Sequence, residues 1–139
     1  MEQNEQSNKI TAIYCRTAAK DAVAIERQRE VLIHYADAHG FEDVKVFEDD
    51  GFSGLNPARP AFVRMNALIA EGRVTRVLTQ KISRLGRDTA AVLAWTRITQ
   101  KHRVEVITQD MGPISDLFAT MQDIFERACL HTKNTAQPN

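Results

Sequence analysis

Two kinds of apolar pattern alternate along this chain, and their alternation limits the possible folds more than any other feature of the sequence. Short β-rich runs, typical of buried strands, alternate with longer segments whose apolar residues recur every three or four positions, as on one face of a helix. The predicted strands are 10–16, 43–48, 76–80 and 104–108, and the predicted helices are 21–39, 60–71, 89–102 and 115–131. The pattern predicts a three-layer α/β fold with a mostly parallel central sheet and helices on both faces.

The length of 139 residues fits one domain with a core of its own. We expect a disordered tail over 1–9, the α/β domain over 10–114, a separate apolar helix over 115–131 and a frayed tail over 132–139. No apolar run is long enough to cross a membrane, and the polar N-terminus is unlike a signal peptide. The sequence therefore predicts a cytoplasmic protein.

The charges are unevenly distributed although the net charge is zero. Residues 73–103 contain eight lysines and arginines and a single acidic residue, Asp88. Such a segment is either a locally basic end of the domain or an ordinary solvated face, and charge alone does not decide between them.

Three polar loops follow predicted strands, at 17–20, 49–59 and 81–88. Since ligands of parallel sheets bind beyond the carboxyl ends of the strands, a site is expected where these loops meet. The strand ends and loops carry four arginines, which are Arg16, Arg59, Arg84 and Arg87. Any one of them could be a surface ion pair, but four guanidinium groups at one edge repel each other unless a phosphate lies between them.

The same segments carry four motifs in a fixed order. They are Tyr14-Cys15-Arg16, then Gln28, then Asp50-Gly51-Phe52-Ser53-Gly54 with Arg59-Pro60, and then Arg84-Leu85-Gly86-Arg87. In order and spacing the chain resembles, from about residue 10 to 110, the N-terminal catalytic domain of serine recombinases of the resolvase/invertase family. Within that family it is most similar to the large-serine-recombinase or transposon-like branch.

The resemblance implies a reaction and a set of residues. In the family a serine hydroxyl attacks a DNA phosphodiester, leaving a 5′-phosphoserine and a free 3′-OH, and needs neither cofactor nor metal. Carried over to this chain, the catalytic positions are Arg16, Gln28, Arg59, Arg84 and Arg87, with support from Asp50, Ser53 and Ser83. The implied partners are DNA and a second copy of the chain, bound as a dimer or tetramer through Leu117, Met121, Ile124, Phe125 and Ala128.

The sequence departs from the family pattern at the attacking residue. Two positions after Arg16, where the family has serine, stands Ala18, whose methyl group cannot attack phosphorus. Thr17 is a poor substitute, since neighbouring side chains on a strand point to opposite faces. Ser83 stands where many members have aspartate. Family members carry a DNA-binding domain after the catalytic one, and this sequence does not include it, so we expect either a fragment of a larger protein or a stand-alone catalytic-type domain.

Three interpretations follow. The first is a recombinase domain deficient in strand cleavage, and the second is a non-catalytic accessory or regulatory protein that associates with an active recombinase or with DNA. The third, a flavodoxin-like or receiver-type phosphate-binding domain, is disfavoured because the first strand ends at Arg16 and the third is followed by Lys81, where a receiver pocket needs acids.

Overall fold

The computed structural model describes residues 9–114 and residue 127, and within them the sheet has five strands. The elements in chain order are β1 (Ile10–Thr17), α2 (Ala22–Ala38), β2 (Val44–Asp50), α3 (Pro60–Ala70), β3 (Val74–Thr79), α4 (Ile82–Leu85), α5 (Thr89–Lys101), β4 (Glu105–Thr108) and β5 (Gly112–Pro113). The strand order is β2-β1-β3-β4-β5, and all neighbours pair in parallel except β4 and β5, which are antiparallel.

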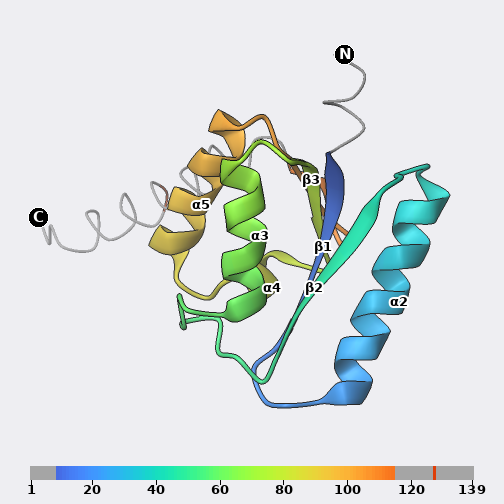
Figure 1. The fold of residues 1–139 in the computed structure, drawn as a ribbon. Coiled ribbons are helices and arrows are strands. Elements are labelled where there is room, and N and C mark those ends of the chain that lie inside the picture. The colour runs from blue at the N-terminus through green and yellow to red at the C-terminus, as the bar shows by residue number, and fades with distance from the viewer. Residues whose placement is uncertain (1–8, 115–126, 128–139) are drawn as a thin grey trace, which may run out of the picture.

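Helices cover both faces of the sheet, as the alternating pattern predicts. Helix α2 lies on one face and α3 and α5 on the other (Figure 1). On the α2 side Ile25 and Leu32 pack against buried residues of β1, β3 and β4, and on the other side Met65 and Trp95 belong to a second buried cluster. The three-layer, mostly parallel α/β architecture is confirmed.

Three local predictions need correction. The predicted loop 81–88 contains the short helix α4, and β2 continues through the predicted loop residues to Asp50. The apolar spacing predicts Val92, Trp95, Ile98 and Thr99 on one face of α5, but Ile98 is 49% exposed. The buried face uses Thr96 beside the predicted Thr99, and both are compatible with burial because each hydroxyl donates to a carbonyl of its own helix.

The end of β1 is paired unequally on its two sides. Pairing with β2 continues to Thr17, opposite Asp50, whereas the ladder with β3 stops at Tyr14, opposite Thr79. The backbone amide and carbonyl of Arg16 therefore have no partner in β3 and need partners outside the sheet.

The predicted helix 115–131 lies outside the described residues, apart from residue 127, as do the two predicted tails except Lys9. Cys15 is a free, buried thiol, and Cys129 is among the residues not described. No helix within the described part of the chain is long and apolar enough to cross a membrane.

Candidate functional site

Arg16 is the most deeply buried arginine of the site, with 1% of its surface exposed. Its guanidinium group donates from Nη1 to the Phe52 carbonyl at 2.9 Å, from Nη2 to the Ser83 carbonyl at 2.7 Å and from Nε to the Arg84 carbonyl at 3.0 Å. One side chain at the end of β1 thus connects the loop after β2 with α4. The sequence shows that Arg16 belongs to this edge, but not that main-chain oxygens are its partners.

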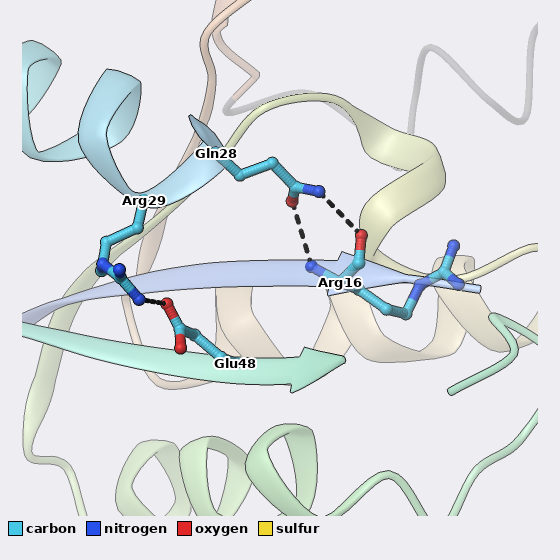
Figure 2. Close-up of polar contacts among 4 residues, drawn as sticks. All are labelled: Arg16, Gln28, Arg29 and Glu48. Carbon is cyan, nitrogen blue, oxygen red and sulfur yellow. Dashed lines mark hydrogen bonds and ion pairs between the residues drawn. The ribbon is translucent and has the colours of Figure 1, made fainter. Parts of the chain in front are cut away.

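Gln28 occupies the place of the missing β3 neighbour. From the buried face of α2, its Oε1 accepts from the Arg16 amide at 3.1 Å and its Nε2 donates to the Arg16 carbonyl at 3.0 Å (Figure 2). The adjacent Arg29 pairs with Glu48 of β2, so α2 is tied to two strands. Gln28 therefore holds the backbone of β1 just before residue 18.

Replacing Gln28 with leucine is expected to lower the free energy of unfolding by about 2 kcal/mol, since the buried Arg16 amide loses its acceptor. The Arg16 carbonyl retains a bond from Arg84 Nη1 at 3.2 Å, which limits the loss. Urea unfolding measures the effect. Arg27→Leu on the exposed side of α2 is the matched control, and an equal effect of both changes would contradict the role assigned to the amide.

Arg59 is the second buried arginine, 4% exposed, and it lies at the start of α3. Its Nη2 donates to the Leu85 carbonyl at 2.7 Å and its Nη1 to the Tyr14 hydroxyl at 3.0 Å. Its guanidinium carbon lies 4.1 Å from the centre of the Phe62 ring. Arg59 and Arg16 therefore share α4 as a target, since the terminal carbonyls of a short helix have no partners within it.

Asp49, at the end of β2, was missed by the sequence analysis as a site residue. Its carboxylate accepts from the Tyr14 hydroxyl at 2.7 Å and from the amides of Ala61 and Phe62 at 2.8 and 3.0 Å. It thus caps α3, whose N-cap residue Arg59 makes no capping bond with its own side chain. The one sign of this distant cap in the sequence was that the helix is preceded by arginine instead of a residue that can cap it. Burial, and then the bond to Asp49, raises the pKa of Tyr14, which keeps the hydroxyl protonated.

Arg84 and Arg87 lie nearer the surface, the first half-buried and the second exposed. The Arg84 Nε is the one buried side-chain nitrogen or oxygen among the described residues without a partner. The Arg87 amide donates to the Gly54 carbonyl at 3.1 Å, and its side chain runs over Gly54. A Cβ on Gly54 would lie 2.8 Å from Arg87 Cγ and 2.9 Å from Arg16 Nη2, so only glycine allows this approach.

The four arginines come together with one buried carboxylate near them, that of Asp49, which is linked to Arg59 through the Tyr14 hydroxyl. Within residues 9–114, none of the four forms an ion pair with Asp or Glu. Burial lowers the pKa of Arg16, and the charges of Arg59, Arg84 and Arg87 lower it further. Nor do the described residues include a group of three or more His, Cys, Asp or Glu side chains suited to a metal. The site is a cationic cluster without a direct ion pair to a carboxylate, which favours an anion.

Ala18 directly follows the last residue of β1, two residues after Arg16, and its side chain is exposed. Thr17 is buried, and its hydroxyl donates to Asp50 Oδ1 at 2.5 Å while accepting from the Gly51 amide at 3.1 Å. Asp50 Oδ1 also accepts from the Asp21 amide at 2.7 Å. The turn that carries residue 18 is thus fixed at both ends.

The remaining predicted site residues, Ser53 and Ser83, are both exposed. Ser53 Oγ accepts from the Leu55 amide at 3.1 Å, which shapes the loop after β2. Ser83 takes part in the network through its carbonyl, the acceptor of Arg16.

The turn at Asp50 should loosen in acid. Bonds from Thr17 and then from the Asp21 amide hold the pKa of Asp50 below its ordinary value. A carboxylate with a lowered pKa contributes stability that is complete above the unfolded value, near 3.9, and is lost as the pH falls through the lower folded value. We expect the Asp50 carboxyl signal in NMR to titrate below pH ~3.9. In Thr17→Val its midpoint should rise toward the ordinary value, and an unchanged midpoint would contradict this assignment.

Comparison with known proteins identifies the family and the fold of the chain. The family model for the resolvase N-terminal domain matches residues 11–136, whereas no curated protein matches the sequence. Among solved structures, the N-terminal catalytic domain of TP901-1 integrase is 25% identical with a TM-score of 0.75, over 93% of this chain and all of that one. A resolvase family site-specific recombinase from Streptococcus pneumoniae is 25% identical with a TM-score of 0.72, over 92% and 94% of the two chains.

The C-terminal catalytic domain of ISC1926 TnpA, an IS607-like serine recombinase, is 28% identical with a TM-score of 0.66. This match covers 70% of the present chain and 65% of that one. With a family match over almost its whole length and the same fold in several recombinase structures, the chain belongs to the resolvase N-terminal domain family.

Proposed function

We propose that this chain is a site-specific recombinase domain of the serine type that binds DNA but does not cleave it. The observation that carries the proposal is Ala18, an exposed methyl group two residues after Arg16, in a domain whose four clustered arginines form no ion pair with a carboxylate among the described residues. Family membership supports recombination as the process in which the domain acts. Ser83, in place of aspartate, supports the large-serine-recombinase or transposon-like branch, and a cytoplasmic location is part of the proposal.

The chemistry of the family defines what is missing. A serine oxygen forms a bond to phosphorus, the bond from phosphorus to the 3′ oxygen breaks, and the proton ends on that 3′ oxygen. Arginines lower the cost of negative charge that develops on the phosphate oxygens. The charge-stabilising part of this machinery is present in the cluster of Arg16, Arg59, Arg84 and Arg87, but the nucleophile is absent.

Thr17 does not replace it. Its hydroxyl is buried and both donates to and accepts from neighbours in the turn, so attack would require breaking the bond to Asp50. Gln28 and Asp50 support the position by fixing the backbone on either side of residue 18.

The test combines binding with a search for covalent product. The chain should bind a mixed-sequence DNA duplex weakly, with an affinity that falls steeply as salt increases. Denaturing electrophoresis should show no protein–DNA adduct. Arg103→Ala removes one positive charge at the amino end of β4, away from the cluster, and this variant should bind DNA as the unaltered chain does. An adduct on the unaltered chain would refute the cleavage defect, and no binding at low salt would refute the DNA role.

We also propose self-association through Leu117, Met121, Ile124, Phe125 and Ala128, which lie outside the described residues. The apolar spacing of this segment supports a helix shared with a second copy, or with a full-length recombinase in the accessory role. Sedimentation should show a dimer that Met121→Asp and Ile124→Asp convert to a monomer. A monomer at high concentration that also fails to bind a recombinase would refute both forms of the proposal.

A further inference from the structure

Leu55 is the most exposed large apolar side chain among the described residues, with 66% of its surface open to water. It lies in the loop between β2 and α3, one residue after Gly54. Gly54 packs against the side chains of Arg16 and Arg87, and its carbonyl accepts from the Arg87 amide at 3.1 Å. An apolar side chain that is open to water therefore stands next to the cationic cluster, at the edge of the sheet where the proposed function places DNA.

The main chain around Leu55 is held in place by hydrogen bonds. The Leu55 amide donates to Ser53 Oγ at 3.1 Å, and the Asn56 amide donates to the Ser53 carbonyl at 3.0 Å. Asn56 in turn accepts from the Ala58 amide at 2.9 Å through its side chain and from Arg59 Nε at 2.9 Å through its carbonyl. The loop thus presents leucine on a fixed frame, so little conformational entropy is lost when a partner covers this side chain.

We propose that Leu55 is a wedge that enters the minor groove and inserts between neighbouring base pairs when the domain binds DNA. The inference rests on the proposed function, and it adds an apolar contact with the bases to the electrostatic attraction of the phosphates. Leucine is one of the apolar side chains that open a base step in this way. Flexible steps such as TA open at lower cost than stiff ones, so Leu55 gives the domain a preference for DNA that deforms easily.

A protein partner is the alternative occupant of this surface. Leu55 lines an open pocket of about 420 Å³, and Ile98 of α5 lines it as well. The neighbouring arginines favour DNA, because guanidinium groups without an ion pair are stabilised by phosphates and are costly to cover with an apolar protein surface. Ile98 is 49% exposed and lies toward the other end of α5 from Arg87, so it serves as the control for an apolar side chain on the same pocket.

Affinity and its salt dependence test the apolar contact. Leu55→Ala should weaken binding of a mixed-sequence duplex about tenfold, because the apolar side chain no longer leaves water on binding. The slope of log affinity against log salt should stay unchanged, since no phosphate contact is lost. Leu55→Met should retain most of the affinity, and Ile98→Ala should bind as the unaltered chain does. An equal loss in Leu55→Ala and Ile98→Ala would assign the effect to the pocket and overturn the wedge.

The stacking of the bases tests the insertion itself. The fluorescence of 2-aminopurine in a duplex rises when the base is unstacked, so the unaltered chain should raise the signal of a duplex labelled at several positions. It should also bind a duplex rich in TA steps more tightly than one without them. Both effects should disappear in Leu55→Ala. Unchanged fluorescence in the complex with the unaltered chain would overturn the wedge without the use of any variant.

These measurements separate failure of the wedge from failure of the function. If the unaltered chain does not bind DNA, the proposed function fails and the wedge fails with it. If the unaltered chain and Leu55→Ala bind DNA equally well, the wedge alone is wrong and the function stands. Urea unfolding should show that Leu55→Ala is as stable as the unaltered chain, because the position is exposed. A loss of self-association without a loss of DNA binding would assign Leu55 to a protein contact and overturn the inference.

Discussion

Ala18→Ser should convert the chain from a protein that forms no covalent link with DNA into one that forms a 5′-phosphoserine adduct. Residue 18 is exposed at the end of β1, and the turn around it is held by Gln28 on one side and Asp50 on the other, so a hydroxyl can be added without repacking. Since the unaltered side chain has no attacking atom, the change is from none to detectable. Incubation with a random duplex library, followed by denaturation and sequencing of protein-linked 5′ ends, measures it.

Ala19→Ser is the matched control, with the same added atom one residue further along an exposed segment. It should give no adduct, because its hydroxyl lies at residue 19 and not at residue 18, the second position after Arg16. If Ala18→Ser binds DNA but never becomes linked to it, the absent serine is not the sole defect. In that case the accessory role becomes the better account of the chain.

Asp49→Ala should cost about 3 kcal/mol of the free energy of unfolding, or more. The carboxylate is 1% exposed and accepts three hydrogen bonds, so its removal leaves the Tyr14 hydroxyl and two amides of α3 without that partner in a buried site. A loss of this size is a large part of the stability of an ordinary domain. Urea unfolding followed by Trp95 fluorescence gives the change in midpoint and slope.

Asp37→Ala, an exposed change on α2, provides the comparison and should lie within about 0.5 kcal/mol of the unaltered chain. The Asp49 variant should also lose affinity for DNA, since Tyr14 contacts both Asp49 and Arg59. A cost below about 1 kcal/mol would mean that water replaces the carboxylate, and that Asp49 is not the anchor of α3.

The sequence predicted the order of strands and helices because each has a distinct apolar period, and it placed the starts of α2 and α5 within one residue of their N-caps, Asp21 and Asp88. It did not predict β5, because two residues carry no period. It placed Ile98 instead of Thr96 on the buried face of α5, because it could not show that the Thr96 hydroxyl is satisfied within the helix.

For the site, the shared edge of the four arginines was predictable, because the carboxyl ends of parallel strands meet there. The burial of Arg16 and Arg59 was not, because their main-chain acceptors are common to every residue and leave no mark in a sequence. Asp49 was missed for a related reason: it caps a helix that begins 11 residues later in the chain, beyond the reach of a local capping pattern.

The use of main-chain oxygens by Arg16 has a consequence for protein engineering. Phe52 and Ser83 contribute their carbonyls to it, and any amino acid except proline could supply the same oxygen without disturbing the backbone amide. Libraries that randomise these two positions should therefore yield many folded variants, whereas Gly54, against which Arg16 and Arg87 pack, should tolerate almost no replacement. These loops can therefore vary in sequence while the hydrogen bonds that hold them in place, which use main-chain oxygens, are kept.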